Sequence, residues 1–302
     1  MTALDTTLGS VHLSSPLIAA SGTVGSVVDF SRVIDFSVYG AAVAKSVSPE
    51  PWSGKTAPRL APAGHGMLNG IGIQNPGIAV WAEEVGPRID DVPTQVWGSA
   101  VAEDPGGFAE AAAGLSGAGV AAIEVNLSCP NLGGKLFALD ARASAKVINE
   151  VRSATELPVG AKLSPNAVDV VTVAEAVAEA GADWVVLTNT VWGAGFDVKT
   201  RRPKLSGVVG GYSGAALKPI ALRCVWEVAR AIPELPIVGC GGIRTVDDAI
   251  EYLLAGASAF AVGTEHLATP RVGRRIVADL ERWMRAEGVA NIGELVKGAV
   301  EW

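Results

Sequence analysis

Short apolar runs recur along this chain and alternate with helix-forming segments, and this alternation constrains the fold more than any other feature. The runs are nearly continuous in apolar residues, as expected for parallel strands that are buried on both faces. Eight of them can be identified: Pro16–Ala20, Ala41–Lys45, Thr94–Trp97, Ala122–Leu127, Val159–Leu163, Trp184–Thr188, Ile237–Cys240 and Ala259–Val262. Since eight strand–helix units close on themselves, the sequence predicts an α/β fold, a (β/α)8 TIM barrel.

Helical patterning fills most of the intervals between these runs. The expected helices cover Gly106–Ala118, Arg142–Thr155, Val171–Ala180, Leu217–Ala231, Val246–Ala255 and Arg271–Glu287. No internal repeat and no linker divides the chain. Residues 1–302 are therefore expected to form one barrel domain, a size that suits this fold.

Two connections are too long for ordinary strand-to-helix loops. One runs from Val47 to Pro93, and the other from Asn189 to Ala215. Both leave the carboxyl ends of strands, so they are expected to extend over the mouth of the barrel, where barrels build their active sites. The segment Phe196–Pro203 within the second connection is expected to form a small hairpin.

Composition excludes several classes of function. The net charge is −7 without any basic block, which argues against nucleic acid as a partner. No apolar run approaches the roughly 18 residues that a membrane span needs. The first residues, Met1 to Asp5, lack the pattern of a signal peptide, and three scattered cysteines predict neither a disulfide framework nor a metal site. We expect a cytoplasmic protein.

One segment concentrates chemistry at the end of a predicted strand: Asn126-Leu127-Ser128-Cys129-Pro130-Asn131. Cys129 could be a general base, a nucleophile or a buried thiol. His65 and His266 are the nearest candidates on the rim for a histidine partner, and neither has a clear partner of its own. This weakens a Cys–His nucleophile and favours direct proton abstraction by a thiolate.

Two glycine-containing turns follow the last two predicted strands. They contain Gly241-Gly242 and Gly263-Thr264, at the place where barrels commonly bind a phosphate. A flavin mononucleotide and a phosphorylated substrate would fit these turns equally well. Cys240, beside the first turn, is expected to be structural, and Cys224 falls within a helical pattern and is expected in the core.

Polar residues interrupt the apolar pattern near the same rim. Lys45 and Lys162 stand near the ends of two runs, and a buried lysine is costly unless it is paired or meets an anionic ligand. Four asparagines fall in rim loops, where an amide can match the imide edge of a pyrimidine or bind a carboxylate. These are Asn69, Asn126, Asn131 and Asn189. For any one of them, turn or capping duty is the commoner role.

Taken in order, these segments resemble the dihydroorotate dehydrogenases of class 1 along nearly the whole chain. The matching motifs are Ala20-Ser21-Gly22, Lys45-Ser46, Asn69 to Gly77, Asn126 to Asn131, Lys162 to Asn166, Asn189-Thr190, Asp197 to Pro203, Gly210 to Gly214, Gly241-Gly242 and Gly263-Thr264. The resemblance implies a barrel that holds FMN without a covalent bond and oxidises (S)-dihydroorotate to orotate in pyrimidine (UMP) synthesis.

The resemblance also assigns roles to residues. Cys129 would remove the C5 proton while the C6 hydride passes to flavin N5. The substrate would be held by Lys45, Asn69, Ile71, Gly72, Ile73, Asn126, Asn131, Asn189 and Thr190. FMN would be held by Ser21, Lys45, Ser46, Asn126, Lys162, Gly214, Gly241, Gly242, Gly263 and Thr264.

Within that family, cysteine as the base resembles class 1 and not the membrane-associated class 2. The Gly72 to Gly77 loop and the Asp197 to Pro203 segment resemble the NAD-linked subclass 1B. That subclass works as a heterotetramer of two catalytic and two electron-transfer chains, the latter carrying FAD and a [2Fe-2S] cluster. Trp192 and Phe196 are bulky residues in the expected lid. The sequence leaves open whether they alter the choice of electron acceptor or the shape of the pocket.

Other functions stay open at this point. A fumarate-linked class 1A enzyme would share the rim chemistry. Another FMN barrel, related to dihydropyrimidine dehydrogenase or to tRNA dihydrouridine synthase, is a further candidate, although the acidic balance speaks against tRNA. A sugar-phosphate aldolase or isomerase would instead use Lys162 as a Schiff-base lysine. A purely binding module is the least favoured.

Overall fold

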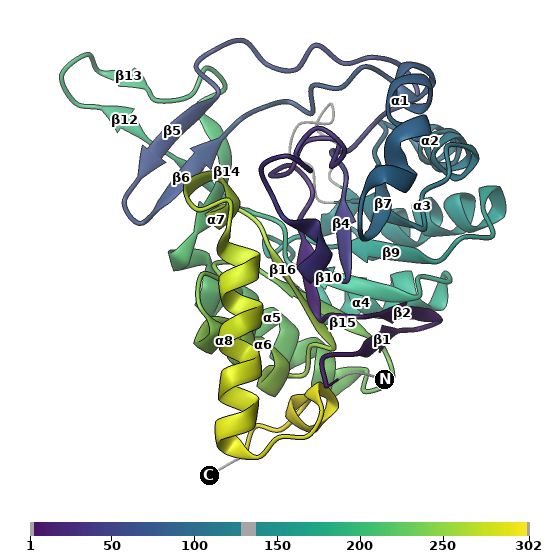
Figure 1. Cartoon of the computed structure of the whole chain (residues 1–302). Coiled ribbons are helices and arrows are strands. Elements are labelled where there is room, and N and C mark those ends of the chain that lie inside the picture. The colour runs from purple at the N-terminus through teal and green to yellow at the C-terminus, as the bar shows by residue number, and fades with distance from the viewer. Residues whose placement is uncertain (1–2, 128–136, 301–302) are drawn as a thin grey trace.

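The computed structural model describes residues 3–127 and 137–300. Among these residues, eight parallel strands close a barrel (Figure 1), so the predicted fold is confirmed. Each strand coincides with one of the predicted apolar runs. Around the barrel they are β3 (Leu17–Ala19), β4 (Ala41–Val43), β7 (Gln95–Ala100), β8 (Ala122–Asn126), β9 (Val159–Lys162), β10 (Trp184–Leu187), β15 (Ile237–Cys240) and β16 (Ala259–Val262).

Helices cover the outside of the barrel, and the six predicted ones are present to within a residue at each end. The α-helices are α1 (Ile78–Glu84), α2 (Pro105–Gly117), α3 (Ala141–Ala154), α4 (Val170–Glu179), α5 (Lys218–Ala231), α6 (Val246–Ala255), α7 (Glu265–Ala268) and α8 (Val272–Glu287). Short 3-10 turns are η1 (Phe36–Val38), η2 (Gly86–Asp91), η3 (Phe137–Leu139), η4 (Ala215–Leu217) and η5 (Ile292–Leu295). The sequence prediction missed α1 and α7, and β3 is followed by η1 in place of an α-helix.

Side-chain caps explain why several helices begin where they do. Asp104, Asp140 and Asp169 each accept a hydrogen bond from a first-turn backbone N–H of α2, α3 and α4. Thr245 and Asp248 form a reciprocal capping box at the start of α6. Each cap satisfies a backbone donor that has no partner within the helix.

A hairpin before the barrel closes its lower end. It consists of β1 (Thr6–Leu8) and β2 (Val11–Leu13), and its apolar side chains join the cluster inside the barrel. The rings of Trp97 and Trp184 lie 5.0 Å apart in this interior cluster. Since this end is filled, a ligand can enter only from the opposite end, where the strands have their carboxyl ends.

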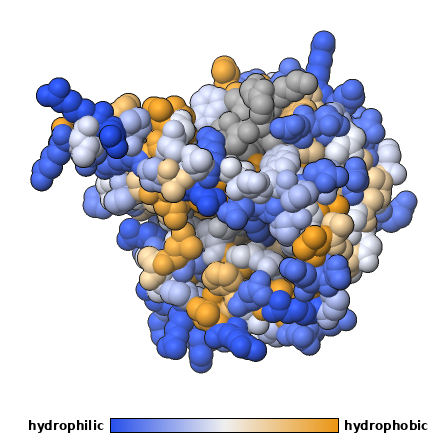
Figure 2. Space-filling view, turned by 90° about the horizontal axis from the view of Figure 1, so that it is seen from above, coloured by the Kyte–Doolittle hydropathy of each residue, from blue (hydrophilic) through white to orange (hydrophobic). Residues whose placement is uncertain are grey.

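The two long connections meet in one antiparallel sheet, which we call the arm. Its strands are β11 (Val191–Ala194), β14 (Val209–Gly214), β6 (Gly66–Asn69) and β5 (Leu60–Ala63). The predicted small hairpin is confirmed as β12 (Phe196–Asp197) paired with β13 (Arg202–Pro203), and it projects away from the barrel (Figure 1). Seen from above, the tip of this projection is hydrophilic (Figure 2). None of the described helices is long and apolar enough to cross a membrane.

Candidate active site

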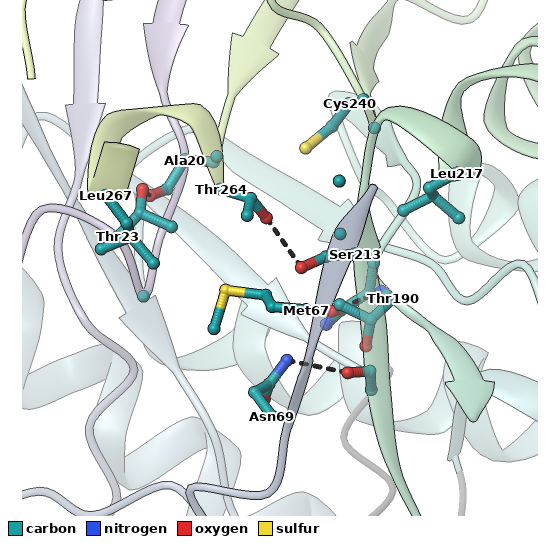
Figure 3. A pocket seen from close by; sticks show the side chains of 18 of the residues that line it. Ala20, Thr23, Met67, Asn69, Thr190, Ser213, Leu217, Cys240, Thr264 and Leu267 are labelled. Carbon is teal, nitrogen blue, oxygen red and sulfur yellow. Dashed lines mark hydrogen bonds between the residues drawn. The ribbon is translucent and has the colours of Figure 1, made fainter. Parts of the chain in front are cut away.

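A cavity of about 670 Å³ opens at the carboxyl ends of the barrel strands, between the barrel and the arm (Figure 3). Every site residue that the sequence predicts within the described part of the chain lines it: Ser21, Lys45, Ser46, Asn69, Ile71, Gly72, Ile73, Asn126, Lys162, Asn189, Thr190, Gly214, Gly241, Gly242, Gly263 and Thr264. Cys129 and Asn131 lie outside the described residues. Trp192 and Phe196 are exposed on the arm and do not line this cavity.

The turn after β15 presents bare backbone to the cavity. Gly241 and Gly242 have φ angles of +147° and +70°, in a region that residues other than glycine rarely adopt. A Cβ atom on Gly242 would lie 2.8 Å from the Cβ of Lys218 and 3.0 Å from the Ala215 carbonyl oxygen. The hydroxyl of Tyr252 donates to the Gly241 carbonyl over 2.6 Å and fixes the turn from behind. The turn can therefore approach a phosphate closely, and its residues fit the phosphate of a bound nucleotide cofactor.

Hydrogen bonds tie the arm to the barrel around the cavity. The Thr264 hydroxyl, from the segment after β16, donates to the Ser213 hydroxyl of β14 over 2.7 Å (Figure 3). Within the arm, the Asn69 amide donates to the Gly211 carbonyl over 3.2 Å and so braces β6 against β14 at the cavity wall (Figure 3). The arm is thus a fixed wall of the cavity, and not a separate lobe.

The carboxamides of the rim are oriented by one another. Asn126 donates to the Ser46 hydroxyl over 3.0 Å, and Asn189 donates to the Asn126 side-chain oxygen over 3.4 Å. The backbone N–H of Thr190 donates in turn to the Asn189 side-chain oxygen over 2.7 Å. This chain of bonds fixes which amide edge each side chain can present to a ligand, as recognition of a polar heterocycle requires.

Lys162 is paired beneath the cavity with a residue that the sequence analysis missed. Its Nζ lies 3.5 Å from Oε1 of Glu124, and the two side chains are only 7% and 3% exposed. Burial lowers the pKa of Lys162, but the Glu124 carboxylate more than offsets this and holds that pKa above its ordinary value. Within the described part of the chain, Glu124 Oε1 has no hydrogen-bond partner. The signal was present: Glu124 interrupts an apolar run, as the two lysines do.

Cys240 faces the same cavity, and burial raises the pKa of its thiol despite the nearby Lys162 ammonium. The raised pKa favours the neutral thiol, so Cys240 is poorly suited to act as a thiolate base. Cys224 is buried in α5, as predicted. Neither cysteine offers an alternative to Cys129 as a reactive thiolate.

His266 follows β16 at the rim but does not line the cavity, and the expectation that it lacks a partner is wrong. It is buried in α7, where Nε2 lies 2.8 Å from the Tyr39 hydroxyl and Nδ1 lies 3.3 Å from the Thr23 hydroxyl. Burial lowers the pKa of His266 to about 4. Through Thr23, which lines the cavity, His266 holds the loop after β3 in place. Because the ring is neutral and buried, it is not suited to donate a proton to a ligand.

The comparisons with known proteins agree with this geometry. The family model described as dihydroorotate dehydrogenase matches residues 3–284. The catalytic subunit of dihydroorotate dehydrogenase B (NAD(+)) from Desulforudis audaxviator is 43% identical over 97% of this chain and 96% of its own length. The protein of the same name from Pelobacter propionicus is 42% identical over 97% of both chains. The crystal structure of DHODH from Eimeria tenella with ferulenol has a TM-score of 0.82 and 21% identity, covers 97% and 88% of the two chains, and supports the fold alone.

The ion pair gives a first testable prediction. Glu124→Gln removes the anion beside a buried ammonium, so we expect the pKa of Lys162 to fall, because burial then acts without the opposing carboxylate. Nuclear magnetic resonance of isotope-labelled lysine, followed against pH, measures this directly. Glu124→Asp keeps the charge and serves as the matched control. An unchanged Lys162 titration in the glutamine variant would mean that other groups set its charge.

A second prediction follows from His266. Its folded-state pKa of about 4 lies below the ordinary 6.5, so the unfolded chain binds the proton more readily. The neutral ring therefore makes its full contribution to the free energy of unfolding above pH 6.5, and this contribution is lost as the pH falls towards 4. The total loss is about 3 kcal/mol.

Urea unfolding between pH 4 and 6.5 tests this. We expect His266→Asn to be less stable than the parent at neutral pH but to lose less stability on acidification over this interval. Cys224→Ala, a change at a buried residue that carries no charge in this pH range, is the control and should keep the parent's pH dependence. Equal slopes in the parent and His266→Asn would refute the assignment.

Proposed function

The chain belongs to the dihydroorotate dehydrogenase family, and we propose that it oxidises (S)-dihydroorotate to orotate with a bound FMN, in pyrimidine synthesis. The observation that carries this proposal is the gathering, in one cavity, of a glycine turn, a compensated buried lysine and mutually oriented carboxamides. The family model spans nearly all of the barrel. We propose that residues 1–302 act as a single FMN-binding domain.

The cofactor would be held both at its phosphate and at the rest of the molecule. We assign Gly214, Gly241, Gly242, Gly263 and Thr264 to the phosphate and Ser21, Lys45, Ser46, Asn126 and Lys162 to the rest of the cofactor, all of which line the cavity. Bound FMN supplies a hydride acceptor at its N5 atom. The ammonium of Lys162 holds positive charge in the cavity wall, where it would stabilise negative charge on a bound ring system.

The substrate would lie against the amide-rich wall. We assign its contacts to Lys45, Asn69, Asn126, Asn189 and Thr190, to the loop Ile71, Gly72 and Ile73, and to Asn131. Amides match both the imide edge and the carboxylate of dihydroorotate, and their mutual hydrogen bonds hold them in place before the substrate arrives. Such preorganised donors lower the cost of binding and of reaction.

Cys129 is our candidate for the base that removes the C5 proton. Its own position lies outside the described residues, but in the sequence it stands three positions after Asn126, the last residue of β8, which lines the cavity. A thiol with an ordinary pKa near 8.5 needs only modest activation to supply thiolate at neutral pH. Bound FMN would accept the C6 hydride, and loss of the C5 proton and the C6 hydride together would give the ring double bond of orotate.

A Schiff-base aldolase is disfavoured by the state of Lys162. That chemistry needs a neutral amine, usually one whose pKa is depressed. Burial lowers the pKa of Lys162, but Glu124 raises it further, so the residue stays an ammonium.

We further propose that electrons leave through a partner chain to NAD. Relatives at 42–43% identity are named as NAD(+) catalytic subunits, and a catalytic subunit implies another subunit. The proposed partner carries FAD and a [2Fe-2S] cluster, in a cytoplasmic heterotetramer of two chains of each kind. Purification of the chain together with its partner, followed by an NAD reduction assay, tests this separately from the chemistry at the rim.

The primary test is anaerobic mixing of the purified, FMN-loaded chain with dihydroorotate while the flavin absorption is followed. Rapid bleaching is the expected result. Dihydrouracil, which lacks the carboxylate, is the control substrate and should bleach the flavin far more slowly. Bleaching by dihydrouracil alone would favour another pyrimidine reductase, and failure to bind FMN would refute the flavin assignment.

The same assay tests the base. Cys129→Ser should keep FMN but slow the bleaching by about 10²-fold or more at neutral pH, because a serine hydroxyl is a far weaker acid and general bases contribute roughly this much. Cys224→Ala, at a buried cysteine in α5, is the matched control and should bleach at the parent's rate. Near-normal bleaching by Cys129→Ser would reassign the proton transfer.

A further inference from the structure

A second cavity lies on the outer surface, between the segment after β3 and the start of α8. Its volume is about 460 Å³, and it shares no lining residue with the cavity at the barrel mouth. It is lined by Ser31, Arg32, Val33, Ile34, Asp35, Tyr39, Pro270, Arg271 and Arg274. Three arginines against one aspartate leave a net of two positive charges in its wall, in a chain whose net charge is −7.

The placement of these arginines opposes the dipole of α8. Arg271 is the N-cap of this helix of 16 residues, Arg274 lies in its first turn, and that turn contains no acidic residue. The amino end of a helix carries partial positive charge, so cations there are unfavourable and anions are favourable. The same chain follows the rule at α6, whose first turn carries Asp247 and Asp248. The first turn of α8 therefore lacks the negative charge that its dipole favours.

One carboxylate offsets this charge only in part: the hydroxyl of Ser37 chiefly lowers the pKa of the Asp35 carboxyl and the guanidinium of Arg274 contributes to that lowering, although Asp35 and Arg274 form no ion pair. Arg32, Arg271 and Arg274 form no ion pair within 4 Å among residues 3–127 and 137–300, whereas the exposed Arg88, on η2, pairs with Asp29 at 2.9 Å. Asp35 shares the cavity wall, but it caps η1: its carboxylate accepts from the hydroxyl of Ser37 over 2.6 Å and from its backbone N–H over 3.2 Å.

We propose that this cavity binds a small phosphate-bearing anion, independently of the barrel mouth. Guanidinium groups present paired donors that match the oxygens of a phosphate, and a helix amino end adds backbone N–H groups and a favourable dipole. The volume of about 460 Å³ suits a small molecule. The floor is firm, because Tyr39 is held through its hydroxyl by His266.

Calorimetric titration with inorganic pyrophosphate at constant ionic strength tests the site. The protein is first saturated with FMN, so that the glycine turn at the mouth is filled and cannot contribute. Arg271→Gln with Arg274→Gln should weaken pyrophosphate binding about tenfold or more, because two charge-assisted contacts are lost. Arg282→Gln with Arg285→Gln removes the same charge from the other end of α8 and should leave the affinity nearly unchanged.

Thermal unfolding gives an independent measurement. Pyrophosphate should raise the melting temperature of the parent but not of the Arg271/Arg274 variant, and without pyrophosphate that variant should melt no lower than the parent, because repulsion at the helix end is relieved. If pyrophosphate bound equally weakly to both double variants, the attraction would be one of non-specific charge and the proposal would be overturned. Equal affinity for citrate would also overturn it, because it would remove the preference for phosphate. Loss of partner-chain binding without any pyrophosphate binding would assign these arginines to a protein contact instead.

Discussion

Closure of the parallel barrel is the constraint on which the remaining structure depends. Parallel strands that close on themselves place all their carboxyl ends on one rim. Residues as distant in sequence as Ser21 and Thr264 thereby line one cavity. The β1–β2 hairpin fills the opposite end with apolar side chains, and the two tryptophans fill the middle. The rim is the end left open, and the arm then walls one side of it.

At the rim, the buried positive charge of Lys162 is compensated by the carboxylate of Glu124. An isolated ammonium at the position of Lys162 would be expensive to bury, and the Glu124 carboxylate makes its charged state stable before any ligand is present. Register explains the geometry: Asn126 of β8 stands opposite Lys162 of β9, so Glu124, two residues earlier, points to the same side of the sheet. The cavity thus presents a fixed positive charge at its floor without a net charge in the core.

Much of this could be predicted from the sequence, because parallel strands buried on both faces leave a simple local signal. Every barrel strand coincides with an apolar run, and the residues after those runs meet on the rim. The arm could not be predicted, because β6 pairs with β14 across more than a hundred residues. The role of His266 was missed for a related reason: its partner Tyr39 lies 227 positions away. Local patterns record which element a residue enters, but not which distant side chain it meets.

The two charged cavities differ in a way that burial explains. At the mouth, an unpaired cation would lie in a low-dielectric interior, so the fold supplies its counter-charge at Glu124. At α8, the arginines are solvent-exposed, and water screens their repulsion enough for the helix to form without a carboxylate. Exposure therefore lets the second cavity keep a net positive charge, which Asp35 offsets only in part and which a buried site could not tolerate. An incoming anion would neutralise that residual charge, so charge should supply most of its binding energy at the second cavity. At the mouth, by contrast, a ligand should be recognised by the shape of the cavity and by its oriented amides.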